Sequence, residues 1–415
     1  MKPFLKYLLT VCVVIACTIG IISWQIHQKN TLPNFSIEFD KRDLGRIQAL
    51  AWKDFNSKDE TNSYSQNKAA ASLGKALFFD QRFSKNGDMS CATCHEPKTN
   101  WTSQQPQLKR DVPSLWNVAH NRWFFWDGRA DSLWSQALGP LENSFEQAGS
   151  RTQFAKLISE DPQYRSQYEN VFGKLPDITD NKLYPVPAKP SKDDAIADKN
   201  WQSMTAENQL VINRIFVNIG KAIAAFEQQV ITAPTRFDSF AEGISQKDQQ
   251  KVNLLSASEQ RGLKIFIGKG KCTLCHSGPN FSDREFHFIH LPLEESEQLE
   301  QARLSGVKKL YASPFNSLGK FSDDKKGKRA ERLTFLKVDP ESIGHYKTPT
   351  LRNAVHTAPY MHNGQFKTLR QVIDFYSEMK DANNRQPHLE RVLKPLLLNE
   401  SEKVDLEAFL RSLSK

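Results

Sequence analysis

Apolar residues recur at helical spacing along much of this 415-residue chain. One apolar position every three or four residues is typical of amphipathic helices that pack on a core. The residues that show the pattern best are Val211, Ile215, Ile219, Ile223 and Phe226, then Leu369, Val372, Ile373 and Tyr376. The final segment, 401–415, repeats it, and strand-like alternation is scarce. The sequence therefore predicts a mainly α protein.

Short polar motifs mark where several of these helices begin and end. A serine or threonine followed three positions later by a glutamate or glutamine forms a capping box, which satisfies free N–H groups at a helix start. The pairs with this spacing are Ser256 with Glu259 and Thr368 with Gln371. Gly268 and Gly270 are expected to end the helix that begins after Ser256. The proline-rich segment 174–194 predicts a loop.

The first 30 residues contain an uncharged stretch, residues 7–26, preceded by Lys2 and Lys6. Its length suffices to cross a bilayer, so residues 1–30 are expected to form an N-terminal transmembrane helix. Lysines ahead of the span keep the N-terminus in the cytoplasm and place the remaining chain, in a bacterium, in the periplasm. A cleaved signal peptide is the alternative, although a small-residue cleavage site is missing. A lipoprotein box ending at Cys17 is a weaker alternative.

The charge of the chain says little about a partner. The formal net charge is +9 at pH 7, and three of the lysines responsible, Lys2, Lys6 and Lys29, lie in the predicted anchor. The exported part is thus only mildly basic, and no arginine-rich stripe interleaved with aromatic residues is present. Nucleic acid is therefore not expected as a partner.

Two C-x-x-C-H motifs contain four of the six cysteines. The first consists of Cys91, Cys94 and His95, and the second of Cys272, Cys275 and His276. A zinc site would need the two pairs close in sequence, commonly about 15–20 residues apart, and a thioredoxin-like dithiol would not need the histidine. Covalent haem c needs all three residues, because two thiols bind the porphyrin and the histidine binds the iron. The favoured interpretation is two covalently bound haem c groups, with His95 and His276 as proximal ligands.

Each haem motif follows a short helical run, LGKALF in one half and RGLKIF in the other. This shared design predicts two cytochrome c-like haem domains in tandem behind the anchor. The expected bounds are 31–240 for the first domain and 241–415 for the second, with a charged insertion at 291–340. The insertion has mixed charge and no sustained apolar stripe, so it is expected to be solvated, with a partner-docking loop as the alternative.

Five ordered motifs extend this picture: LGKALFFDQRFSKNGDMSCATCH, VPSLWNVAHNRWFFWDGRADSLWSQALGPLENSFEQ, GKAIAAFEQQVITAPTRFDSFAEG, CTLCHSGPNFSD and KTPTLRNAVHTAPYMHNGQFKTL. With them the chain resembles the bacterial di-haem cytochrome c peroxidase and MauG family. The resemblance implies that one haem reacts with hydrogen peroxide while the other relays electrons.

Cleavage of peroxide requires an open iron position and a base that moves a proton between the two oxygens. By its place in the family motif, the pocket above the first haem is implied to contain Gln136, Pro140 and Glu146. Glu146 would be the acid-base residue, and Glu142 is the nearby alternative. The resemblance further places Trp126 between the haems as a stepping stone for electrons. His362 is implied either to relay protons or to stabilise its loop.

The resemblance also implies ligands for metals beyond the two histidines. A calcium ion near the interface would be held by Asn117, Thr357 and Pro359, and oxygen ligands of this kind suit Ca²⁺. The sixth ligand of the second haem is methionine in the peroxidases and tyrosine in MauG, and the family spacing leads here to Tyr376. A buried core tyrosine is the plainer interpretation, and the alternative ligands are Met361 and Met379. A phenolate ligand would lower the potential of that haem.

One departure from the family concerns the first haem. Many di-haem peroxidases carry a histidine after the first motif that closes the iron in the fully oxidised state, but residues 96–110 contain no histidine. The nearest candidate, His120, is expected to be structural. The first haem is therefore predicted to be open when fully oxidised.

The sequence as a whole predicts a membrane-anchored periplasmic di-haem peroxidase of the MauG-like branch. It would reduce hydrogen peroxide with electrons from a small cytochrome c, a cupredoxin or quinol. The first alternative is a MauG-like oxidase that modifies side chains of a partner protein. The second, from a different class, is a di-haem electron carrier without catalysis.

Overall fold

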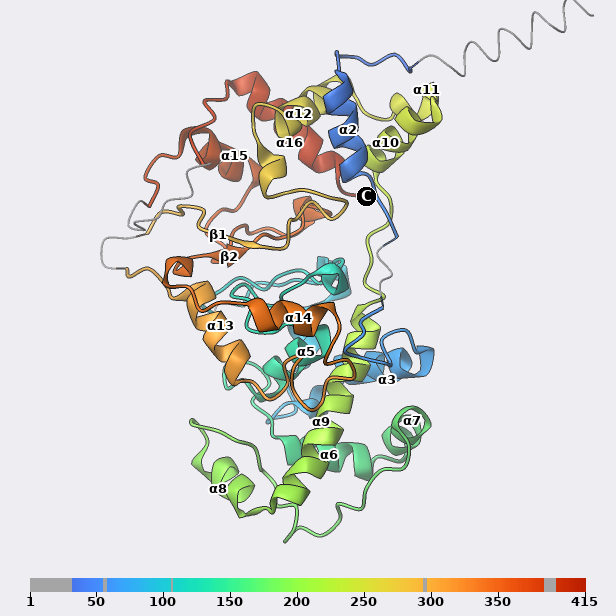
Figure 1. Ribbon diagram of the computed structural model, residues 1–415, viewed down its shortest axis with the longest axis vertical. Helices are drawn as coiled ribbons and strands as arrows, with labels where there is room; N and C mark the ends of the chain where they lie inside the picture. Colours follow the sequence, from blue (N-terminus) through green and yellow to red (C-terminus); the bar gives the residue numbers. More distant parts are fainter. Residues whose placement is uncertain (1–31, 55–57, 106, 294–296, 384–392) are drawn as a thin grey trace, which may run out of the picture.

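The computed structural model describes residues 32–54, 58–105, 107–293, 297–383 and 393–415. The predicted anchor at 1–30 lies outside these ranges. The described chain is mainly helical, as expected, and it forms an upper and a lower lobe in Figure 1. The larger helices are α2 (Lys41–Leu50), α3 (Lys68–Phe79), α5 (Leu133–Glu142), α6 (Arg151–Glu160), α7 (Pro162–Phe172), α8 (Ala195–Ser203), α9 (Ala206–Glu227), α10 (Arg236–Gln246), α12 (Ala257–Ile267), α13 (Ala302–Ala312), α14 (Lys328–Phe335), α15 (Leu369–Glu378) and α16 (Glu400–Ser412).

Shorter helices connect these elements and contain the haem motifs. They are η1 (Gln81–Phe83), α4 (Cys91–Cys94), η2 (Pro97–Thr99), η3 (Val118–His120), α11 (Gln249–Val252), η4 (Cys272–Leu274), η5 (Pro340–Ser342) and η6 (Ala354–His356). Two short strands, β1 (Phe286–His287) and β2 (Tyr346–Lys347), pair antiparallel at the level where the lobes meet (Figure 1). The predicted loop at 174–194 is confirmed, since no helix lies between α7 and α8.

The lower lobe is built around α9. This helix is long and apolar enough to cross a membrane, but most of it is buried, and it forms the centre of the first core. It crosses α3 at Gly74, where an added Cβ would lie 1.9 Å from the carbonyl oxygen of Ala222. Only glycine fits such a contact, because a larger residue would separate the two helices. The glycine of the LGKALF run thus fixes the crossing that positions the first haem motif.

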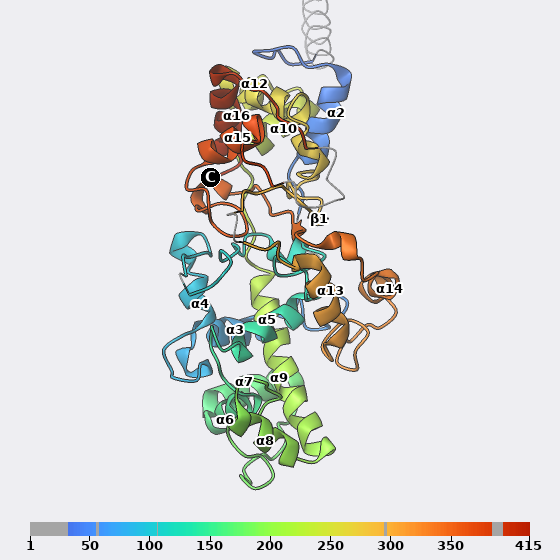
Figure 2. The same ribbon diagram turned by 90° about the vertical axis from the view of Figure 1, so that its left-hand side faces the viewer.

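The upper lobe repeats this construction with α12 and α16. Gly262 of the RGLKIF run packs against the carbonyl oxygen of Asp405, again at 1.9 Å from where a Cβ would stand. The helix ends at its Gly268 cap, and the capping box of Ser256 with Glu259 is formed, as predicted. Figure 2 shows α12, α15 and α16 together above α3, α5 and α9. The two runs therefore have the same packing role, which supports two copies of one unit.

The expected domain limit needs a correction at the N-terminal side. The expected first domain begins at residue 31, but Ile47 and Leu50 of α2, together with Phe39 ahead of the helix, pack in the second core. The contacts of α2 lie with α10 and α12, more than 180 residues away in sequence. The apolar face of a short helix shows that it packs, but it does not show on which core.

The expectation of a solvated insertion at 291–340 is also wrong. Its described part forms α13 and α14, which pack against the first-domain loop that contains Trp123 (Figure 1). Arg303 is only 5% exposed, lies 4.6 Å over the Trp123 ring, and donates to the carbonyl oxygens of Asp127 and Gly128. Leu310 of α13 and Leu333 of α14 also pack with Trp123, but one buried leucine from each short helix makes no sustained apolar stripe in the sequence.

Both halves contain one structural unit repeated at a constant offset of 236 positions. In the first half η3 is followed by an isolated bridge from Phe124 to Ala130 and by α5. In the second half η6 is followed by a bridge from Tyr360 to Phe366 and by α15. Asn117 and Asn353 both adopt left-handed backbone before their η helices, with φ of 55° and 58°. This repeat identifies equivalent positions above the two haem motifs.

Candidate functional site

A cavity of about 1220 Å³ extends through the region where the two cores meet. Its wall contains residues of both haem motifs, namely Cys91, Cys94, His95, Cys272, Cys275 and His276. The four cysteines form no disulfides with one another. The structure thus directs both predicted attachment sites toward one internal space.

The two motif histidines are held in the same way. His95 Nδ1 lies 2.9 Å from the carbonyl oxygen of Trp101, and His276 Nδ1 lies 2.9 Å from that of Phe281. A carbonyl partner fixes the proton on Nδ1 and leaves Nε2 as the ligand atom. Burial lowers the pKa of His95 to about 4 and also lowers that of His276, so both rings are neutral. These residues fit a haem in each half.

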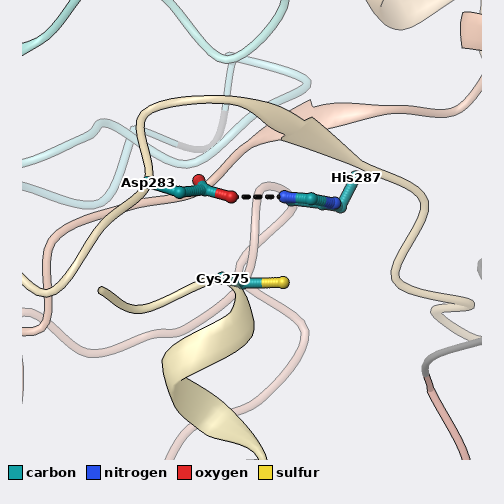
Figure 3. Close-up of side chains that lie close together, drawn as sticks. All are labelled: Cys275, Asp283 and His287. Atoms are coloured by element: carbon teal, nitrogen blue, oxygen red, sulfur yellow. Dashed lines mark hydrogen bonds and ion pairs between the residues drawn. The ribbon is translucent and has the colours of Figure 1, made fainter. Parts of the chain in front are cut away.

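The second motif adds a partly buried ion pair, shown in Figure 3. His287 Nε2 lies 2.7 Å from Asp283 Oδ2, and the Cys275 sulfur lies close to both residues. The three donor atoms fall within 4.8 Å of one another, a spacing that a metal ion could use. The C-x-x-C-H motif assigns Cys275 to a thioether bond, which removes the thiolate from such a set. Asp283 and His287 are therefore interpreted as a fixed ion pair beside the second haem.

In the first half, Glu146, Gln136 and Pro140 all line the cavity. Burial raises the pKa of Glu146, while Arg129 opposes the shift. Burial and the nearby Glu146 carboxylate raise the pKa of the Cys94 thiol to about 11, which places Glu146 close to the first motif. The Gln136 Oε1 atom is buried without a partner among the described residues. The predicted pocket residues are thus brought together.

The alternative acid, Glu142, forms an ion pair with Arg151. Its two carboxylate oxygens accept from Arg151 Nε and Nη2, both at 2.9 Å. A bidentate pair of this kind fixes the carboxylate in one orientation. Glu142 does not belong to the wall of the cavity. The geometry therefore favours Glu146 over Glu142 as the acid-base residue.

The repeat shows which residues of the cavity wall are equivalent in the two halves. Pro140 on α5 and Tyr376 on α15 are separated by the offset of 236, and both line the cavity. Burial, and then Cys275 and Cys272, raise the pKa of the Tyr376 phenol, so this side chain lies near the second motif. Proline has no side-chain donor atom, whereas tyrosine offers an oxygen. The two halves thus differ in ligand capacity at one equivalent position.

The methionine alternatives to Tyr376 are placed differently. Met379 follows α15 as its cap and is not part of the cavity wall, whereas Met361 lines the cavity in the loop before His362. In the repeat, Met361 corresponds to Phe125, and both have positive φ, 73° and 64°. Met361 thus belongs to a tight loop and not to the helix above the motif.

Trp126 and His362 are also equivalent in the repeat, and both line the cavity where the halves meet. The indole Nε1 of Trp126 donates to the carbonyl oxygen of Asp111 at 2.8 Å, which fixes the ring. The His362 ring stacks on Tyr346 with centroids 3.5 Å apart. Its Nδ1 is buried without a partner among the described residues, and burial lowers its pKa to about 4. Trp126 thus lies where the halves meet, and its place between the two haems stays a prediction.

Comparison with known proteins decides the family. The family described as di-haem cytochrome c peroxidase matches residues 68–246. Cytochrome-c peroxidase IdrP1 of Denitromonas iodatirespirans is 30% identical over 355 residues, which cover 82% of this chain and 80% of that protein. The chain belongs to the di-haem cytochrome c peroxidase family. It is therefore an oxidoreductase, and membership implies two haem cofactors.

Other members of the di-haem peroxidase family support this assignment. The methylamine utilization protein MauG of Methylorubrum extorquens is 29% identical over 349 residues, covering 82% of this chain and 77% of that protein. The diheme peroxidase BthA of Burkholderia thailandensis shares 20% identity, covers 88% of this chain and 89% of its own, and superposes with a TM-score of 0.60. This last likeness shows the fold alone. The relatives thus include both peroxidases and MauG.

The calcium site of the di-haem peroxidase remains a prediction. Asn117 Oδ1 accepts from the backbone N–H of Thr232 at 2.9 Å, and its Nδ2 donates to Asn280 at 3.0 Å. Thr357 and Pro359 line the cavity, whereas Asn117 does not. The oxygen of Asn117 also accepts from the Thr232 hydroxyl at 3.3 Å, and the described side chains do not form a closed oxygen cage.

His120 lies away from the cavity wall, as a structural residue would. It is half-buried, and burial together with Arg284 and Arg122 lowers its pKa to about 4. It is therefore not positioned above the first motif.

Sequence reasoning missed several residues of the site. Arg129, Asp111, Lys347 and Glu227 all line the cavity. Glu227 is 4% exposed, and burial raises its pKa to about 8. The offset of 236, visible as PSLWNVAH against PTLRNAVH, could have identified Asp111 and Lys347 as an equivalent pair.

Proposed function

We propose that this di-haem peroxidase reduces hydrogen peroxide to water at the first motif and receives electrons through the second. The difference between Pro140 and Tyr376 at equivalent positions supports this division most strongly. A proline leaves the place above the first motif without a ligand atom. A tyrosine oxygen closes the corresponding place in the second half. One site is then available to peroxide, and the other is suited to electron transfer.

The protein would supply the proton chemistry at the first site. When bound there, haem supplies the iron that binds peroxide and takes up the electrons. Glu146 would take the proton from the near oxygen and return it to the leaving oxygen, a role that a buried carboxylate near its pKa performs well. Arg129 opposes the effect of burial on Glu146, and the Gln136 Oε1 atom is buried without a partner among the described residues. All three residues line the same cavity, which supports the assignment.

Trp126 would serve as the stepping stone between the halves. Its indole N–H is bound to the Asp111 carbonyl, and its own carbonyl accepts from Lys347 N–H at 2.9 Å. The first bond keeps the ring in one orientation, and the second holds its backbone to the other half. A rigid aromatic group at this place suits electron transfer and needs little rearrangement.

The site residues are proposed to work in the periplasm, where the two haem c groups are attached to the four thiols. The chain would be held to the inner membrane by residues 1–30. A small cytochrome c, a cupredoxin or quinol would supply the electrons. The calcium ligands Asn117, Thr357 and Pro359 stay part of the proposal.

A second candidate is the oxidation of side chains on a partner protein. Its support is the similarity to MauG over 82% of the chain, together with Tyr376 at the position above the second motif. Both candidates use the same residues at the first site. They differ in where the electrons come from. A peroxidase takes them from a diffusing donor, whereas a side-chain oxidase takes them from the partner protein that it oxidises.

Steady-state kinetics of the purified di-haem protein test the proposal. Catalytic oxidation of a reduced small cytochrome c or cupredoxin by hydrogen peroxide, with water as product, is the expected result. If peroxide is consumed only once per molecule with every donor tried, the peroxidase proposal fails and side-chain oxidation is favoured. If neither haem reacts with peroxide, the chain is an electron carrier.

A further inference from the structure

The inference concerns Lys347, which follows Tyr346 on β2 and lines the cavity. Burial lowers the pKa of its ammonium group to about 8, and Asp283 partly opposes the shift. Within the described residues, its Nζ has one hydrogen-bond contact, with the Thr348 carbonyl oxygen at 3.5 Å, the outer limit for such a bond. A cation that is partly buried on the cavity wall and has so weak a partner is costly unless an anion completes its surroundings.

Lys347 belongs to the second haem site by its backbone contacts. Strand β2 pairs with β1, so that Phe286 lies opposite Lys347 and His287 opposite Tyr346. The adjoining residues add two bonds, from Thr348 N to the Glu285 carbonyl at 2.9 Å and from Ser282 Oγ to the Thr348 carbonyl at 2.8 Å. These bonds attach the lysine to the segment that follows the second C-x-x-C-H motif.

The nearest protein carboxylate is already engaged. Asp283 binds His287 at 2.7 Å, and the described residues contain no acid within 4.0 Å of the Lys347 Nζ. The anionic partner of Lys347 is therefore expected to belong to the group that binds in the cavity. A haem carries two carboxylate side chains, which are the anionic groups that a second-site haem would bring to this wall.

We propose that Lys347 binds a haem carboxylate in the second half and so raises the reduction potential of that haem. A cation beside the haem stabilises the reduced iron, which has one positive charge less, relative to the oxidised iron. The inference rests on the proposed presence of a haem at each motif. Lys347 would thus bind the second haem and raise its reduction potential, and the first half has no lysine at the equivalent position.

The repeat provides the contrast. The position equivalent to Lys347 is Asp111, 236 residues earlier, and it also lines the cavity. Each residue donates its backbone N–H across the interface, Asp111 to the His362 carbonyl and Lys347 to the Trp126 carbonyl, both at 2.9 Å. The same position of the repeat thus has an acidic residue in the first half and a basic residue in the second. The electrostatic surroundings of the two haems differ accordingly.

The test is potentiometric titration of the full-length holoprotein, with the two haems followed through their separate spectra. K347M is expected to lower the equilibrium constant for reduction of the second haem at least tenfold, which is about 59 mV for one electron. The first haem should change less than threefold. K347R keeps the charge and should retain most of the wild-type potential. D111N, the matched variant of the first half, should leave the second haem within threefold.

Several results would overturn the inference. K347M could leave the second potential unchanged, or could shift the first haem instead. A wild-type potential of the second haem that changes on addition of phosphate or chloride would mean that a diffusible anion binds Lys347. If K347M does not accumulate, K347Q removes the same charge with a polar side chain. Haem content distinguishes failure of the proposed function from failure of the Lys347 proposal. Fewer than two haems in the wild type would defeat the proposed function. Two haems, with a second potential that K347M does not shift, would defeat only the role of Lys347.

Discussion

The backbone N–H of Lys347 donates to the carbonyl oxygen of Trp126 at 2.9 Å. The equivalent bond of the repeat joins Asp111 N–H to the His362 carbonyl at the same distance. The two halves are therefore joined by reciprocal backbone bonds around the residue proposed to relay electrons. This arrangement makes the interface a fixed part of the site, and it relates the chemistry of each half to an equivalent position in the other.

Replacement of Glu146 by glutamine tests the acid-base assignment. E146Q should reduce kcat for peroxide by about 10²–10⁴-fold, because the pocket loses its proton carrier, while haem content stays the same. The matched control is E142Q, which changes a carboxylate bound to Arg151 outside the cavity and should retain most of the activity. Unchanged turnover in E146Q would remove Glu146 from the mechanism.

The pH dependence of the same step should depend on Arg129. Burial raises the pKa of Glu146 and Arg129 lowers it, so loss of the guanidinium should raise this pKa further. Glu146 acts as a base only when deprotonated, and the rate constant for the reaction with peroxide falls as the pH drops through its pKa. In R129Q this acid limb should move to higher pH. R129K keeps the charge, so its acid limb should move less. If the acid limb of R129Q is the same as that of the wild type, Arg129 does not affect the pKa of Glu146.

Tyr376 should determine the spectrum and potential of the second haem alone. A neutral thioether stabilises the reduced iron better than an anionic phenolate does, so Y376M should raise the second potential and leave the first unchanged. Y376F removes the ligand oxygen with little change of shape. Optical and paramagnetic resonance spectra identify which haem responds. A normal second-haem spectrum in Y376F would show that Tyr376 is a core residue.

Arg303 should stabilise the docking of α13. Its guanidinium donates to two buried carbonyl oxygens and stacks over Trp123, and both carbonyls lose this donor in R303A. The expected loss is about 2–3 kcal/mol in the free energy of unfolding, measured by chemical denaturation. Lys308 on the same helix is exposed, so K308A serves as the control with little change. Equal effects of the two variants would mean that this contact does not hold α13.

Local signals in the sequence predicted the helices well, because they depend on neighbouring residues. The capping box of Ser256 with Glu259 and the apolar face of α9 are both present as expected. The position of α2 and the docking of α13 depend on contacts far away in sequence, which no local pattern encodes. Arg303 in particular looks like a surface residue in the sequence but binds carbonyl groups inside the fold.

The candidate site was predictable where the chemistry requires a fixed motif. Both C-x-x-C-H motifs and Glu146 lie in the cavity wall. The choice between Glu146 and Glu142 needed the structure, because only there does Arg151 bind Glu142. Asp111 and Lys347 were not predicted, because the sequence does not distinguish a charged residue on the cavity wall from one on the outer surface. The repeat that relates them was encoded in the sequence at an offset of 236 positions.

The central claim is that the first haem site is open and the second is closed when both irons are oxidised. Low-temperature electron paramagnetic resonance of the fully oxidised holoprotein tests it most directly. A high-spin ferric signal beside a low-spin one is predicted, because Pro140 offers no ligand where Tyr376 offers an oxygen. Two low-spin signals of equal intensity would contradict the account, since they would require a ligand above the first haem.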